Sequence, residues 1–148
     1  MKQPFLTLTP LARYEDLALL LLRVMVGAFL VWGVADNILS AERMAKFAAF
    51  LDQHGFILPE LMAPLSVWVQ CLVGLAFILG LFTRWAGLLC SINFVVAIVM
   101  VDAQFGIRGA FPAACLVMIG LYLATRGAGA LSLDALITRR AGTTASSG

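Results

Sequence analysis

The chain has 148 residues, of which 62% are hydrophobic and 12% are charged, and its mean hydropathy is +1.00. Soluble domains carry roughly 25% charged residues, so this chain has too few to cover a water-facing surface. The composition argues against a soluble enzyme and a disordered chain. A formal net charge of +2 is too small to indicate nucleic acid as a partner. The composition predicts an integral membrane protein whose first partner is the lipid bilayer.

Four apolar segments are long enough to cross a bilayer as helices, which takes roughly 17–25 residues. Between Asp16 and Asp36 the first contains one charge, Arg23, and the other three contain none. The predicted spans cover residues 17–39, 61–82, 85–101 and 109–125. We therefore predict an all-α, integral membrane four-helix bundle that forms a single domain over residues 1–140. The small, polar residues 141–148 predict a disordered tail.

The connection between the first two spans contains an amphipathic helix. Ser40 can cap a helix over about residues 41–54, and Gly55 can end it. Apolar side chains recur at helical spacing on one face of this segment, namely Met44, Phe47, Ala48 and Leu51. Such a helix is expected to lie in the membrane interface. Residues 131–137 predict a second, shorter amphipathic segment.

The distribution of Lys and Arg predicts the orientation. Four spans place both termini on one side of the membrane. The basic residues of that side are Lys2, Arg13, Arg84, Arg126, Arg139 and Arg140, and those of the opposite side are Arg43, Lys46 and Arg108. The positive-inside rule then places both termini in the cytoplasm.

Arg23 lies about two turns into the first span. A charged side chain in hydrocarbon costs several kcal/mol unless it reaches the headgroups or is paired. Three interpretations are open: the guanidinium snorkels to the headgroups, donates to a ligand, or belongs to a buried polar network.

Four further polar residues are candidates for a quinone site or a polar network. Gln70 and Asn93 lie inside the second and third spans, where amides commonly form interhelical hydrogen bonds. They also suit a quinone, whose headgroup needs a hydrogen-bond donor at each carbonyl oxygen and an apolar slot. Asp36 and Asn37 lie at the outer end of the first span, where Asp36 can be solvated or can pair with a nearby arginine.

No motif indicates a metal or a covalently bound redox cofactor. The chain has one histidine, His54, and three cysteines without CxxC spacing, so the usual ligand sets for zinc or haem are missing. Electrons would therefore have to come from a bound quinone or from another membrane subunit. No catalytic residues are predicted.

Several segments together resemble the DoxX family. The first span carries Leu22, Arg23, Gly27, Phe29 and Gly33, which resemble the opening of that family. Residues 47–51 and 55–59 resemble its amphipathic loop, residues 74–84 its second-helix exit, and residues 127–134 its C-terminal tail. The resemblance covers roughly residues 17–137.

This resemblance implies a four-helix protein of a bacterial-type inner membrane. The family includes the small subunit of a thiosulfate:quinone oxidoreductase, and other members are linked to redox-stress complexes. Two positions depart from the family's common pattern: Gln70 stands in place of an acid, and Asp36 in place of a lysine. Because an amide does not titrate, Gln70 argues against proton transfer at that position.

Three functions remain open. The chain is a quinone-linked subunit of a membrane redox complex, a non-catalytic accessory subunit of a larger membrane assembly, or a small transporter or lipid-binding module. In the transporter, a polar route would be lined by Asp36, Asn93 and Asp102. We favour a quinone-linked or accessory role, and the sequence does not decide whether the chain is an enzyme.

Overall fold

The computed structural model describes residues 9–145, and within this part of the chain all regular structure is helical. Two short 3₁₀ helices and six α-helices follow one another: η1 Thr9–Tyr14, α2 Glu15–Leu39, α3 Ala41–Gln53, α4 Pro59–Leu79, α5 Thr83–Met100, η2 Asp102–Phe105, α6 Gly106–Arg126 and α7 Leu133–Ala145. Four of them, α2, α4, α5 and α6, are long and apolar enough to span a membrane. The predicted all-α fold with four candidate spans is confirmed.

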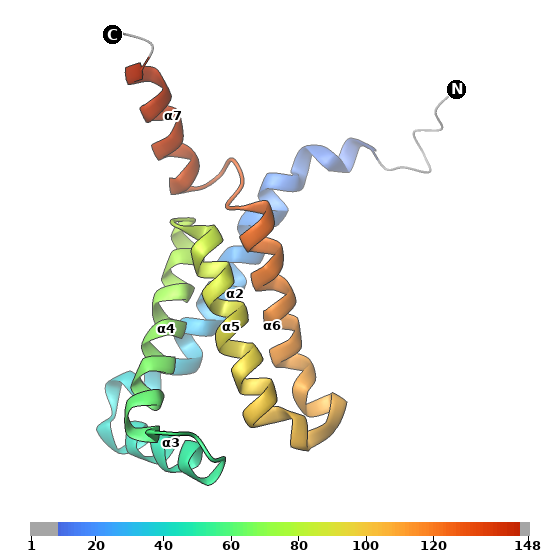
Figure 1. Cartoon of the computed structure of the whole chain (residues 1–148). Helices are drawn as coiled ribbons and strands as arrows, with labels where there is room; N and C mark the ends of the chain where they lie inside the picture. The colour runs from blue at the N-terminus through green and yellow to red at the C-terminus, as the bar shows by residue number, and fades with distance from the viewer. Residues whose placement is uncertain (1–8, 146–148) are drawn as a thin grey trace.

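The helices run between two ends of the bundle (Figure 1). Both η1 and α7 lie at one of them, which we call the terminal end, and α3 lies across the other, the α3 end. The predicted cap of α3 is present, since the Ser40 hydroxyl accepts a hydrogen bond from the Arg43 N–H at 3.3 Å. Just beyond α3, Gly55 has a φ of 76°, a left-handed conformation that suits glycine.

Close packing joins the four long helices into two pairs. In the first pair, α2 meets α4 at Gly27 and Gly74, and a Cβ built on Gly27 would lie 2.5 Å from the Gly74 carbonyl oxygen. In the second, α5 meets α6, and a Cβ on Gly87 would lie 2.5 Å from the Gly120 carbonyl oxygen. Glycine permits such close approach of membrane helices. Each pair is thus a tightly packed unit.

Several helix boundaries differ from the predicted ones by a few residues. Helix α6 spans Gly106–Arg126 rather than 109–125, because helix formation continues through Arg108, which lowers the hydropathy of that turn. Helix α4 ends at Leu79, inside the predicted span 61–82, because Gly80 follows it in a left-handed conformation with φ 65°. Helix α7 continues to Ala145, inside the segment predicted to be disordered, and residues 146–148 lie outside the described part of the chain.

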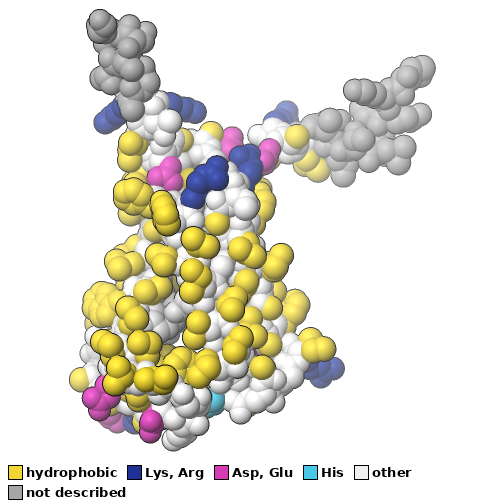
Figure 2. Space-filling model, in the orientation of Figure 1, with side chains coloured by type: hydrophobic (Ala, Val, Ile, Leu, Met, Phe, Trp, Pro, Cys, Tyr) yellow, Lys and Arg dark blue, Asp and Glu magenta, His cyan; other side chains and the backbone are white. Residues whose placement is uncertain are grey.

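The outer surface of the bundle is apolar along its length (Figure 2). Large side chains point outward from all four long helices, for example Trp32, Phe29, Leu72 and Met118, each more than 60% exposed. Soluble proteins rarely expose apolar patches of this extent. A lipid environment removes that cost, which agrees with four membrane-spanning helices.

Candidate functional site

A groove opens between the two helix pairs toward the α3 end. Helices α4 and α5 are joined by a tight turn at the terminal end, and they diverge from there (Figure 1). The space between them forms a cavity of about 500 Å³ under α3. Its walls are mostly apolar, and α3 with the turn after it contributes three aromatic side chains, Phe47, Phe50 and Phe56.

A chain of polar side chains lies inside this groove. The Gln70 amide nitrogen donates to the Ser66 hydroxyl at 3.2 Å. The Ser66 hydroxyl in turn donates to the side-chain amide oxygen (Oδ1) of Asn93 at 3.0 Å. All three side chains line the groove, so the bonds connect α4 to α5 across its wall. The structure therefore brings together Gln70 and Asn93, which the sequence singled out separately.

The chain of bonds leaves hydrogen-bonding groups for a ligand. Within the described part of the protein, no group pairs with the Asn93 amide N–H donors or with the Gln70 carbonyl oxygen. The first can donate to a carbonyl, and the second can accept from a hydroxyl. The cluster thus suits both an oxidised quinone and its quinol. Among the residues lining the groove, Asp102 is the carboxylate.

Asp36 and Asn37 lie outside this groove. The Asp36 carboxylate forms an ion pair with Arg43 at 3.0 Å, and both side chains are more than 60% exposed. Of the two predicted environments of Asp36, pairing with a nearby arginine is the one observed. Asn37 lines a separate polar hollow with Ser40 and Lys46. The polar route through Asp36 and Asn93 that a transporter would need is therefore not assembled in this structure.

Arg23 also lies outside the groove, at the terminal end of the bundle. Its side chain is fully buried, so it does not extend toward headgroups. One terminal nitrogen donates to the Phe77 carbonyl at 3.1 Å, in the last turn of α4. The other donates to the Leu131 carbonyl at 2.6 Å. Phe77 lies in the last turn of α4, where backbone carbonyls carry partial negative charge, and this makes its carbonyl a suitable partner for a guanidinium.

The segment that Arg23 holds is the connection between α6 and α7 together with the first two residues of α7, residues 127–134, which we call the C-terminal strap. The Asp16 carboxylate accepts from the Ala130 N–H at 2.9 Å. The Asp134 carboxylate accepts from the N–H groups of Phe82 and Thr83 at 2.8 and 3.0 Å, and so caps α5. The strap therefore ties α2, α4 and α5 together at the terminal end.

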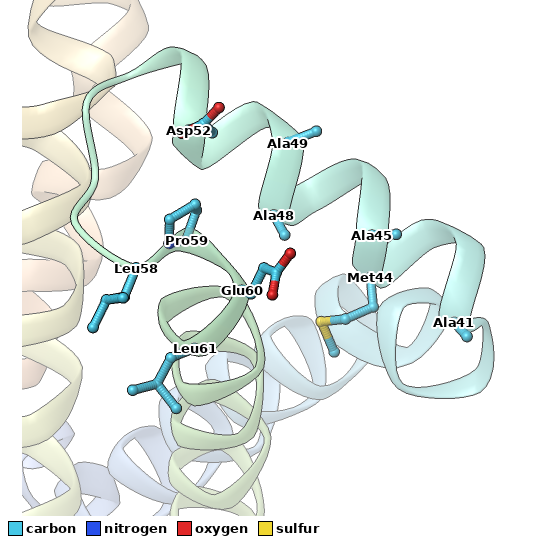
Figure 3. A pocket seen from close by; sticks show the side chains of 10 residues that line it. All are labelled: Ala41, Met44, Ala45, Ala48, Ala49, Asp52, Leu58, Pro59, Glu60 and Leu61. Atoms are coloured by element: carbon cyan, nitrogen blue, oxygen red, sulfur yellow. The ribbon is translucent and has the colours of Figure 1, made fainter.

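A larger hollow lies between α3 and the start of α4 (Figure 3). Its volume is about 820 Å³. Alanines of α3 line one side, and Pro59, Glu60 and Leu61 of α4 the other. Neither Asp52 nor Glu60 takes part in an ion pair within the described residues, and no hydrogen-bonded cluster lies in the hollow. We therefore assign the candidate site to the groove and not to this hollow.

Comparison with protein families gives one match, in which the DoxX model covers residues 18–103. The chain belongs to the DoxX family. The matched part of the DoxX chain contains Arg23, Gln70 and Asn93, whereas the strap lies beyond it. Neither the curated proteins nor the solved structures contain a match.

Sequence reasoning missed three residues that the DoxX structure uses. Ser66 is four residues before Gln70, so both lie on one face of α4, and this spacing was the available signal. Asp16 and Asp134 bind backbone N–H groups far away in the sequence. The resemblance of residues 127–134 to the family's tail pointed to Asp134, although not to its role as a helix cap.

Proposed function

We propose that this DoxX protein is a quinone-binding subunit of a membrane redox complex, with the quinone headgroup in the groove between α4 and α5. The observation that carries the proposal is the Gln70–Ser66–Asn93 cluster inside a mostly apolar cavity of about 500 Å³. Ligand pockets are typically apolar with a few placed polar groups, and volumes of roughly 300–1,000 Å³ are usual. Family membership supports a membrane setting.

The groups in the groove assign roles to the residues. Asn93 donates to a quinone carbonyl oxygen, and Gln70 accepts from a quinol hydroxyl. The aromatic side chains Phe47, Phe50 and Phe56 cover the ring from the α3 end. The groove is open between the diverging helices α4 and α5, so an isoprenoid tail can extend from it into the lipid.

Reduction of a quinone to a quinol consumes two electrons and two protons, and the cluster supplies neither. Amides and a serine do not titrate near neutral pH, and the described residues hold no group of three metal-ligating side chains. In this proposal a partner subunit supplies the electrons. Protons enter through water or through Asp102, which lines the groove. We place this subunit in a bacterial-type inner membrane, with both termini in the cytoplasm.

A binding titration tests the proposal. The purified full chain in nanodiscs is titrated with a short-chain ubiquinone analogue, and the Kd is compared between wild type, Asn93→Leu and Asn37→Leu. The last variant is the matched control, because Asn37 lies outside the groove. We expect Asn93→Leu to raise the Kd about tenfold, which corresponds to roughly 1.4 kcal/mol, and the control to leave it unchanged.

Equal Kd values for all three proteins, or no binding by the wild type, would contradict the proposal. A wild type that binds no quinone yet co-purifies with membrane subunits would instead support the accessory role.

A further inference from the structure

A second cavity lies at the terminal end of the bundle, where residues of the strap form part of its lining. It has a volume of about 650 Å³ and lies between the start of α5, the end of α6 and the first turns of α7. Each of these three helices contributes one arginine to its lining, namely Arg84, Arg126 and Arg139. Basic side chains gather at this end beside the base of α7 (Figure 2).

The acids near this cavity are already engaged. Both oxygens of the Asp134 carboxylate accept backbone N–H groups at the start of α5. Glu15 is paired with Arg126, whose Nε donates to it at 3.0 Å. The lining thus holds three arginines, of which Arg126 is paired with Glu15, and one carboxylate, Asp134, which is held as a helix cap. An anionic group would complement this cavity.

Arg84 is positioned with part of its guanidinium available. Its Nη1 donates to the carbonyls of Ala124 and Thr125 at 3.2 and 2.7 Å, at the end of α6. Among the described residues, nothing accepts from its Nε or Nη2. Two neighbouring N–H groups of one guanidinium form the fork that binds phosphate oxygens.

The surroundings of the cavity indicate an anion that carries hydrocarbon. Trp85 and Phe82 are 69% and 68% exposed, and Ile137 is 57% exposed, and all three line the cavity. Tryptophan beside arginine at the end of a membrane span is typical of the lipid headgroup level. Basic pockets between membrane helices bind anionic lipid headgroups.

From the three arginines and the exposed apolar rim, we infer that this cavity binds the phosphodiester headgroup of an anionic phospholipid. The phosphate lies against Arg84 and Arg139, and the acyl chains run along the outer face of α5 beside Trp85. This site is separate from the groove and does not depend on quinone binding.

Native mass spectrometry of the full chain in detergent tests this inference. Dioleoylphosphatidylglycerol and dioleoylphosphatidylcholine are titrated separately, and the bound fractions are compared for wild type, Arg84→Gln, Arg139→Gln and Arg108→Gln. Arg108 lies at the α3 end and is the matched control. We expect the wild type to prefer the anionic lipid, and each of the first two variants to bind it about fivefold more weakly, as about 1 kcal/mol per arginine implies. Arg108→Gln binds it like the wild type.

Equal binding of the two lipids by the wild type would overturn the inference. Unchanged binding of the anionic lipid by Arg139→Gln would also overturn it. Arg139 is exposed on α7, so this variant can be tested even if Arg84→Gln fails to fold. Full displacement of the lipid by inorganic phosphate at millimolar concentration would show a small-anion site in place of a lipid site.

Discussion

Replacing Arg23 with methionine is expected to lower the free energy of unfolding by about 3 kcal/mol. The variant loses two hydrogen bonds from a charged donor, to the carbonyls of Phe77 and Leu131. Such bonds contribute roughly 1.5–3 kcal/mol each. We use the lower value, about 1.5 kcal/mol per bond, for two reasons. The Arg23 Nε is buried without a partner among the described residues, which already costs the wild type stability. Methionine, being apolar, also avoids the cost of burying a charge.

The same variant should loosen the C-terminal strap. Arg23 bonds to the strap at Leu131, and Arg126 directly precedes the strap in the sequence. Loss of that bond increases local opening of the segment, so trypsin should cleave after Arg126 faster in Arg23→Met than in the wild type. Equilibrium unfolding in mixed detergent micelles gives the free energy, and timed proteolysis gives the opening.

Arg43→Met is the matched control for both measurements. Arg43 pairs with Asp36 at a position where both side chains are more than 60% exposed, and exposed ion pairs contribute roughly 0–1 kcal/mol. Equal free energies of unfolding and equal cleavage rates for Arg23→Met and Arg43→Met would show that Arg23 does not hold the strap.

Three further substitutions test the packing, the helix cap and the groove. Gly27→Ala should destabilise the fold by about 1–3 kcal/mol through overpacking against Gly74, whereas Gly33→Ala, with nothing within 4 Å of its Cβ, should not; thermal unfolding of the two variants compares them. Asp134→Ala should cost about 1 kcal/mol through loss of the α5 cap, and an unchanged melting temperature would contradict this role. Ser66→Ala should raise the Kd for quinone about fivefold, because Gln70 and Asn93 lose the bonds that orient them, and an unaltered Kd would show that the cluster does not act as a unit.

The fold could be predicted from the sequence because its elements follow from local patterns. The four spans are visible as continuous apolar segments. The start and end of α3 are set by single residues, Ser40 and Gly55, next to the helix itself. The start of α6 was predicted less accurately, because the charged Arg108 interrupts the apolar segment although the helix continues through it. The meeting of Gly27 with Gly74 was not predicted, because two single glycines on different helices carry no signal of their pairing.

The candidate site could be predicted only in part, for a related reason. A polar side chain inside an apolar span is conspicuous, so Arg23, Gln70 and Asn93 stood out. Their partners did not, because Arg23 binds backbone carbonyls that any residue could supply. Asn93 meets Ser66 across two helices, α5 and α4, and the residues are 27 positions apart in the sequence.

The central claim, that the groove holds a quinone, is tested most directly by native mass spectrometry of the protein extracted gently with its own lipids. The account predicts that the wild type carries a quinone mass and that Gln70→Leu combined with Asn93→Leu loses it while retaining the fold by circular dichroism. A wild type without quinone, or a double variant that retains as much as the wild type, would contradict the account.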